Sequence, residues 1–263
     1  MIIIDSVTDY EKKFPFKELL ELDYFKEYRD AYYEIPKSGF QLGPRNYYNL
    51  LLYITEINDY NEQHAKGFIK RLKSEGKDWK NAEAIFSEII VYRYYIRPVH
   101  EGLIKGISKI NSECDMIIEL LDGRKQYLEV FCVMPDFKRP TKPGEIVIND
   151  VKTHTQTEMA SIRQKLLRKI DKQKQFSKPR ENFAVIELND SLIARDFTIL
   201  SSLSDGYKIN INKNTQKAVS EGYDWSKSVF HDYSTKFLKG VIYFNLGDYQ
   251  SRKIIMNSNF MDS

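Results

Sequence analysis

Apolar residues recur at intervals of three and four along the first third of the chain, a spacing that predicts amphipathic helices. The pattern covers residues 8–75 and is clearest at 16–22 and 47–54. Pro36 and Pro44 mark a loop that divides it. We therefore expect the chain to begin with a helical region in which the many aromatic residues pack as a core.

A further helix is predicted over residues 79–96, and Pro98 is expected to end it. Glu88 lies near the apolar stripe of this helix. A carboxylate on the packed side of a helix needs a partner, because burying an unpaired charge is costly. Two interpretations are open: Glu88 is a metal ligand, or it pairs with Arg93 or Arg97.

Two short apolar runs joined by an Asp-Gly turn at 122–123 predict a β-hairpin. A two-residue loop would leave Asp115 and Glu129 on opposite faces of the hairpin. A three-residue loop, with the glycine in the left-handed conformation, places them on one face and sets Glu119 opposite Lys125. We favour the second register because it collects the largely apolar side chains on the other face: Cys114, Met116, Ile118, Leu120, Gln126, Leu128, Val130 and Cys132.

Two carboxylates side by side on neighbouring strands repel each other unless a cation lies between them. Oxygen ligands of this kind suit Mg²⁺ or Mn²⁺, which retain several waters and bind phosphate oxygens. Asp115 and Glu129 are therefore a candidate metal site. The alternative interpretation is an ordinary solvated strand face.

Downstream of the hairpin, residues 134–155 are rich in proline and predict a long loop. A long helix is predicted over 157–176 and a buried strand over 182–188. The tail contains a predicted helix at 193–203 and a predicted strand at 239–245. The central order is thus helix, strand, strand, helix, strand, which indicates an α/β unit with a crossover helix.

Composition narrows the class of protein. With 263 residues the chain can form one large domain, or one domain with a helical extension. Its two cysteines, Cys114 and Cys132, are expected to be small buried side chains in a reducing compartment. The apolar start at residues 1–5 is too short for a signal peptide, and no run approaches the length of a membrane span. We expect a soluble, cytoplasmic protein that does not bind membranes.

The net charge is only +3, but the charge is uneven, since residues 161–180 contain one acid, Asp171. The basic residues on the predicted helix are Arg163, Lys165, Arg168, Lys169, Lys172 and Lys174. A local basic patch is typical of proteins that bind phosphate backbones, although a solvated helix face has the same composition.

These elements together resemble the PD-(D/E)XK nuclease superfamily. In that family an aspartate lies on one strand and a Glu-x-Lys motif lies on the next, often with a glutamate from the first helix. Here Asp115 follows a cysteine where Pro-Asp is usual, and Glu129 begins a motif that ends in Phe131 where lysine is usual. The resemblance covers residues 79–190, less than half of the chain.

The resemblance implies a restriction-endonuclease-like core over 79–190, a helical extension over 1–78 and a mixed C-terminal extension over 191–263. It further implies that Asp115 and Glu129 hold Mg²⁺ or Mn²⁺ and that Glu88 joins them as a ligand. The activity implied is metal-dependent hydrolysis of the phosphodiester bonds of nucleic acid, with DNA preferred over RNA as partner.

Phe131 departs from the family's pattern, because it can neither orient a water molecule nor stabilise negative charge. A lysine on the crossover helix, Lys165 or Lys169, would have to replace the missing one. The residues expected to contact nucleic acid are Arg163, Lys165, Arg168, Lys169 and Lys172.

Two other functions are open. The first is a degenerate nuclease fold that binds nucleic acid or a protein without catalysis, and Phe131 is its main support. The second is an assembly or regulatory subunit that forms a homo-oligomer, or binds a protein partner, through its N-terminal helices.

Overall fold

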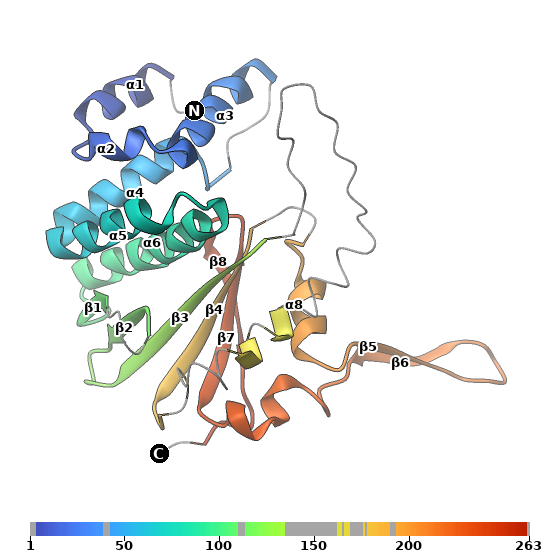
Figure 1. Ribbon diagram of the computed structural model, residues 1–263. Coiled ribbons are helices and arrows are strands. Elements are labelled where there is room, and N and C mark those ends of the chain that lie inside the picture. Colours follow the sequence, from blue (N-terminus) through green and yellow to red (C-terminus); the bar gives the residue numbers. More distant parts are fainter. Residues whose placement is uncertain are drawn as a thin grey trace.

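A computed structural model shows an α/β architecture arranged in layers. The residues that it describes are 4–38, 43–109, 114–134, 162–164, 166–168, 176, 178–189 and 193–261. Helices from the first hundred residues cover one face of a mixed sheet, and α8 (Asp196–Leu203) lies over the opposite face (Figure 1). The predicted α/β class is confirmed at this level.

The helices that precede the sheet are α1 (Ile4–Lys13), α2 (Lys17–Leu20), α3 (Asp23–Ser38), α4 (Tyr47–Tyr60), α5 (Glu62–Glu75) and α6 (Trp79–His100). The strands of the main sheet are β1 (Gly106–Lys109), β2 (Met116–Glu119), β3 (Lys125–Val133), β4 (Glu181–Leu188), β7 (Leu238–Asn245) and β8 (Asp248–Met256). A separate hairpin consists of β5 (Tyr207–Ile211) and β6 (Ala218–Tyr223), and short 3₁₀ turns follow it at Val229–His231 and Tyr233–Thr235.

The main sheet has the strand order β1-β2-β3-β4-β7-β8. Strands β3, β4 and β7 run parallel, whereas β1, β2 and β8 pair antiparallel with their neighbours. A parallel strand covered on both faces should be an almost continuous apolar run, and β4 is buried from Asn182 to Leu188. The strands predicted at 182–188 and 239–245 are therefore confirmed as β4 and β7.

The hairpin formed by β2 and β3 has the register of the three-residue loop. Gly123 adopts a φ of +85°, and its N–H donates to the carbonyl oxygen of Leu120 at 3.0 Å. Glu119 lies opposite Lys125 as predicted. Its carboxylate, however, accepts a hydrogen bond from Lys105 at 2.6 Å, so the ion pair joins β2 to the chain that precedes β1.

Helix α6 runs past the predicted end. Pro98 lies inside the helix, which continues to His100, so the expectation that Pro98 ends it is wrong. A proline removes its own N–H donor and crowds the carbonyl four residues before it, but the N–H groups that follow remain donors, and the N–H of Glu101 still bonds to the carbonyl oxygen of Arg97 at 2.9 Å. The last turn can therefore form around the proline.

Side chains of the central strands alternate between two apolar clusters. Met116, Leu128 and Val130 pack with the helical layer, together with residues of α1 to α6. Phe131 points to the other face, where it packs with residues of α8 and with Ile162. The apolar face predicted for the hairpin is confirmed, and the N-terminal helices share one core with the sheet. Of the two cysteines, Cys114 is buried and Cys132 is only partly so.

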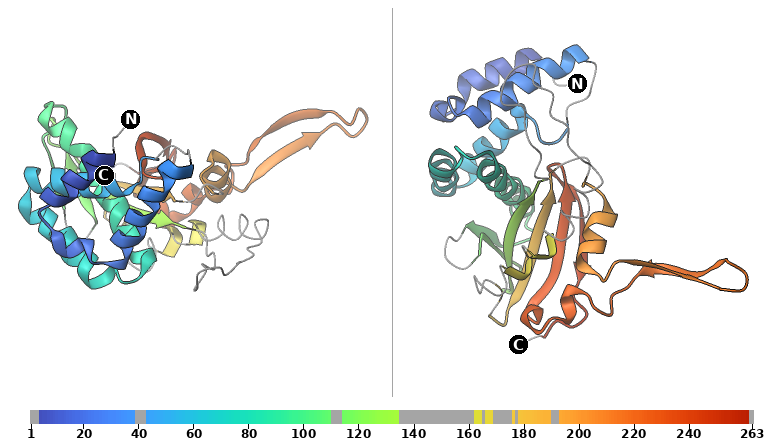
Figure 2. Two further views of the ribbon diagram at one scale, coloured as in Figure 1. Left: turned by 90° about the horizontal axis from the view of Figure 1, so that it is seen from above. Right: turned by 45° about the vertical axis from the view of Figure 1, so that its right-hand side comes forward.

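The hairpin of β5 and β6 projects from the α8 side of the protein as a long arm (Figures 1 and 2). Figure 2 shows in both views that the arm extends well beyond the layered body. Within the described part of the chain, neither of its strands pairs with the main sheet.

Some predicted elements lie outside the described residues. They are nearly all of the loop at 134–155 and most of the helix at 157–176, although 162–164 and 166–168 are helical as predicted. Among the described helices, none combines the length and the apolar character needed to cross a bilayer.

Candidate functional site

Asp115 and Glu129 lie near each other at the end of the β2–β3 hairpin that is farthest from its turn. Met116 and Leu128 form the last pair of the antiparallel register, and Asp115 lies directly beyond that pair, next to the position of Glu129 on β3. The N–H of Asp115 donates to the carbonyl oxygen of Leu128 at 3.1 Å, and the N–H of Val130 donates to Asp115 Oδ2 at 2.8 Å. Asp115 is thus anchored on both sides of Glu129, whose side chain is only 2% exposed.

Charged groups gather around this hairpin end. Burial raises the pKa of the Cys114 thiol to about 11; nearby Arg180 opposes this rise, and Asp115 and Glu129 add to it. The guanidinium carbon of Arg180 lies 3.9 Å from the ring centroid of Tyr127, which precedes Glu129 by two positions and shares its face. A cation therefore lies close to the two carboxylates.

Arg180 was not among the residues singled out from the sequence. Its position could have been predicted in principle, because Arg180 directly precedes β4. The parallel register pairs Glu181 with Gln126, which brings the residue before β4 next to the start of β3. That register, however, is a long-range fact that no local pattern contains.

Glu88 lies on the helical side of the sheet and is held by two cations. Its Oε2 is 3.0 Å from Lys109 Nζ and also bonds to Arg71. The partners expected from the sequence, Arg93 and Arg97, pair with other glutamates. The side chains of Glu88 and Lys109 are only 5% and 4% exposed, so this pair is largely removed from water.

Electrostatics connects this pair to the hairpin. Burial alone would lower the pKa of Arg71, but Glu88 raises it above its ordinary value, and Glu75 and Asp115 add to the rise. The carboxylates of Glu88 and Asp115 therefore both stabilise the charged form of Arg71. Lys109 pairs with Met116 and lies over the Phe68 ring of α5, so it points toward the helices. The Asp115 carboxylate instead accepts the backbone N–H of Val130 beyond the end of β2.

The metal hypothesis rests on a two-residue ligand set. Among the described residues, no three or more histidine, cysteine, aspartate or glutamate side chains form a group suited to a metal ion. Asp115 and Glu129 alone fit a cation that takes oxygen ligands and retains water molecules. The role of Glu88 as a third ligand stays a prediction.

Phe131 occupies the position where the resembled family carries lysine. It lies on the same face of β3 as Glu129, is 8% exposed, and packs in an apolar cluster with Val133 and Ile186. This position therefore contributes to the core, and a cation for the site must come from another element.

Of the five predicted nucleic-acid-binding residues, Arg163 and Arg168 are described. Arg163 donates to the carbonyl oxygen of Ser204 at 2.9 Å and to that of Lys227 at 3.1 Å, so it also holds two loops. Arg168 is exposed. The predicted residues Lys165, Lys169 and Lys172 lie outside the described residues.

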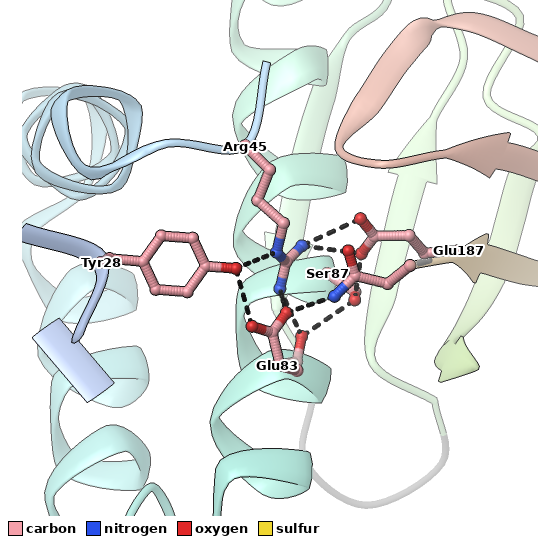
Figure 3. Close-up of polar contacts among 6 residues, drawn as sticks. Tyr28, Arg45, Glu83, Ser87 and Glu187 are labelled. Carbon is pink, nitrogen blue, oxygen red and sulfur yellow. Dashed lines mark hydrogen bonds and ion pairs between the residues drawn. The ribbon is translucent and has the colours of Figure 1, made fainter. Parts of the chain in front are cut away.

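A second polar cluster, absent from the sequence predictions, is buried between the helical layer and the sheet (Figure 3). Arg45 donates from Nη1 to both carboxylate oxygens of Glu187, at 2.9 and 2.8 Å, and from Nη2 to the carbonyl oxygen of Glu83 at 3.0 Å. Arg45 also forms an ion pair with the Glu83 carboxylate. The Tyr28 hydroxyl donates to Glu83 Oε1 at 2.8 Å, and Ser87 bonds to Glu187.

This cluster joins distant segments rather than serving a ligand. The side chains of Arg45, Glu83 and Glu187 are 5%, 1% and 0% exposed. The two carboxylates raise the pKa of Arg45 far above its ordinary value against the effect of burial, while burial raises the pKa of Glu187. Because water and substrate are excluded, we assign the cluster a structural role. Its only sequence signal was a glutamate inside the apolar run of β4.

An open hollow lies elsewhere, between α4, α6 and the start of β8. Its volume is about 960 Å³, and Asp115 and Glu129 do not line it. Two of its arginines are already engaged by neighbouring glutamates, Arg93 by Glu56 and Arg97 by Glu101. The hollow is therefore separate from the candidate site.

Comparison with known proteins gives no indication of function, so the function is inferred from the geometry of the structure. No protein-family model, no curated protein and no solved structure matches this chain.

Proposed function

We propose that this protein is a metal-dependent nuclease that hydrolyses phosphodiester bonds, with DNA as its preferred substrate. The observation that carries the proposal is that the Asp115 carboxylate accepts the N–H of the residue that follows Glu129, which brings the two acidic residues together at the end of the hairpin. Two carboxylates on neighbouring strands, one of them almost fully buried, form a site that favours a divalent cation.

The order of elements also supports the proposal. Apart from β1, which precedes β2, helix α6, strands β2 and β3, the helical residues 162–164 and 166–168 and strand β4 follow one another in the order that the resemblance to the PD-(D/E)XK superfamily implies. On this basis we propose a restriction-endonuclease-like core over 79–190.

Each residue has a task in this proposal. Asp115 and Glu129 would hold Mg²⁺ or Mn²⁺, which supplies a polarised phosphate and a more acidic water molecule. The N–H of Val130 fixes the orientation of the Asp115 carboxylate. Arg180 would bind a phosphate oxygen beside the two carboxylates. Lys165 or Lys169 would supply the ammonium group that Phe131 cannot provide.

The test is cleavage of supercoiled plasmid and of labelled RNA by the purified protein, with Mg²⁺, with Mn²⁺ and with EDTA. The variant Asp115→Asn/Glu129→Gln removes both negative charges while keeping the shapes of the side chains. A matched control, Asp30→Asn/Glu62→Gln, makes the same change at exposed positions of the helical layer. We expect metal-dependent cutting by the wild type and the control only. Cutting that persists in the first variant would assign catalysis to other residues.

A degenerate nuclease fold is the second candidate, and the burial of Phe131 favours it. It predicts a folded wild-type protein that binds nucleic acid in EDTA and cleaves nothing with either metal. Metal-dependent cutting by the wild type excludes it.

A further inference from the structure

The arm formed by β5 and β6 is the most exposed part of the described chain. Every residue from 207 to 221 is exposed, and the arm extends away from the layered body (Figures 1 and 2). A two-stranded hairpin without a packed face is only marginally stable in water. Such an arm gains order when a partner covers it.

The end of the arm is basic and rich in amide groups. The turn at 212–217 contains Lys213, Lys217, two asparagines and a glutamine, and it has no acidic residue. Behind it, the Asn210 amide donates to the Ser220 hydroxyl at 2.8 Å across one face of the hairpin. The opposite face carries the apolar side chains of Tyr207, Ile209 and Ile211.

The base of the arm is firmly held. Asp205 donates its N–H to the carbonyl oxygen of Asp224 at 2.8 Å, and Lys208 forms ion pairs with both aspartates. Arg163 binds the carbonyl oxygens of Ser204 and Lys227, the residues that flank the arm. The arm therefore leaves the protein beside Arg163.

The arm also projects from the appropriate side of the sheet. Helix α8, which leads into β5, packs with Phe131 on the face of β3 that carries Glu129. The helical layer lies on the opposite face. One duplex could therefore contact the arm, Arg163 and the side of the candidate site.

We propose that the β5–β6 arm binds duplex DNA by inserting its basic, amide-rich tip into the major groove. The inference rests on the proposed nuclease function and names its substrate as double-stranded DNA. The major groove of B-DNA admits a two-stranded ribbon and is ~8.5 Å deep, whereas β5 has five residues and spans ~17 Å. Lysines bind phosphate or guanine, and asparagine or glutamine binds adenine. The major groove of A-form RNA is too narrow for such a ribbon.

The test measures binding without cleavage. A short fluorescein-labelled DNA duplex is titrated in EDTA by fluorescence anisotropy with wild type, with Lys213→Gln/Lys217→Gln, and with a control, Lys70→Gln/Lys77→Gln. The control removes the same charge from exposed positions of the helical layer. At about 0.1 M salt we expect the arm variant to bind about tenfold more weakly, with a salt slope smaller by about 2. The control should bind like the wild type, and duplex RNA should compete poorly.

Three results would overturn the proposal: equal weakening in both variants, unchanged affinity in the arm variant, or equal competition by duplex RNA. If the arm variant binds DNA normally while the wild type still cleaves it, the arm inference fails and the nuclease function stands. If the wild type neither binds nor cleaves DNA, both fail.

A second variant separates DNA binding from self-association. Residues 209–220 are replaced by a short Gly-Ser turn, and folding is checked by circular dichroism. Light scattering should give the same mass for this variant and the wild type, with DNA affinity lost as in the lysine variant. A wild-type dimer that becomes a monomer without any loss of DNA affinity would identify the arm as an assembly element and overturn the proposal.

Discussion

Replacing Arg45 by methionine removes the cation at the centre of the buried cluster. Methionine retains much of the length and apolar surface of arginine but donates no hydrogen bond. In the wild type, Arg45 binds both carboxylate oxygens of Glu187 and also the carboxylate and carbonyl oxygens of Glu83. The variant leaves two buried carboxylates facing each other without a counter-charge.

The expected cost follows from this geometry. Removing one partner of a buried ion pair typically destabilises a protein by about 3–5 kcal/mol. The free energy of unfolding of a native protein is only about 5–15 kcal/mol, so the Arg45→Met variant should lose a large part of its stability. We would measure this loss by urea unfolding, followed by circular dichroism and tryptophan fluorescence. Arg97→Met is the control on α6, because Arg97 is 79% exposed and its pair with Glu101 is screened by water.

The pH dependence provides an independent check. Burial raises the pKa of Glu187 above its ordinary value of 4.5, and Arg45 opposes that rise. A carboxyl with a raised pKa in the folded state binds protons more tightly than in the unfolded state, so its effect on stability worsens as the pH rises above 4.5. Without Arg45 the pKa of Glu187 rises further. The cost of Arg45→Met should therefore be smaller at pH 5 than at pH 8.

Two results would refute this reasoning. One is a loss below about 1 kcal/mol, the value typical of an exposed pair. The other is a cost that does not change between pH 5 and pH 8. A second substitution, Glu187→Gln in the Arg45→Met background, should recover part of the loss because it removes one of the two unpaired charges.

Two further predictions concern the hairpin and the cysteines. Gly123→Ala should lower stability by about 1 kcal/mol and Tm by ~2–4 °C, because Gly123 has a φ of +85°. The helical control Gly67→Ala should not lower Tm in the same thermal melt, and an equal Tm for the two variants would contradict the left-handed turn. Burial raises the pKa of Cys114 to about 11 and also raises that of Cys132, so iodoacetamide should modify neither thiol at pH 8 within the time that labels both in urea. Rapid modification of the native protein, read by mass spectrometry, would contradict this.

Local chemistry explains which parts of the fold were predictable from the sequence. The Asp-Gly turn and the gathering of mainly apolar side chains on one face determine the hairpin register, and with it the position of Asp115 near Glu129 at the end of the hairpin. Strands β4 and β7 could be predicted from their apolar runs because strands covered on both faces need apolar side chains throughout. Each of these inferences uses contacts within a strand or across one turn.

Long-range pairing explains the failures. Arg45 and Glu187 are separated by 142 positions, and no sequence pattern near either residue predicts their contact. Glu88 was correctly expected to need a partner, but Arg71 and Lys109 become its partners only once α5 and β1 pack beside α6. The extent of α6 past Pro98 was missed for a different reason, since a proline weakens a last turn without preventing it.

The separation of Arg45 from Glu187 along the chain also determines how long after Arg45 its partner is synthesised. At ~5–20 residues per second, the 142 positions between them take roughly 7–28 s to translate. In the later part of that interval α6 has been made but β4 has not, and Arg45 then has Glu83 but not Glu187 as a carboxylate partner. The side of α6 that covers the sheet in the folded protein, with Ser87 and Tyr95, remains open to solvent. We therefore expect chaperones to bind the nascent helical layer until β4 arrives and brings Glu187 to Arg45.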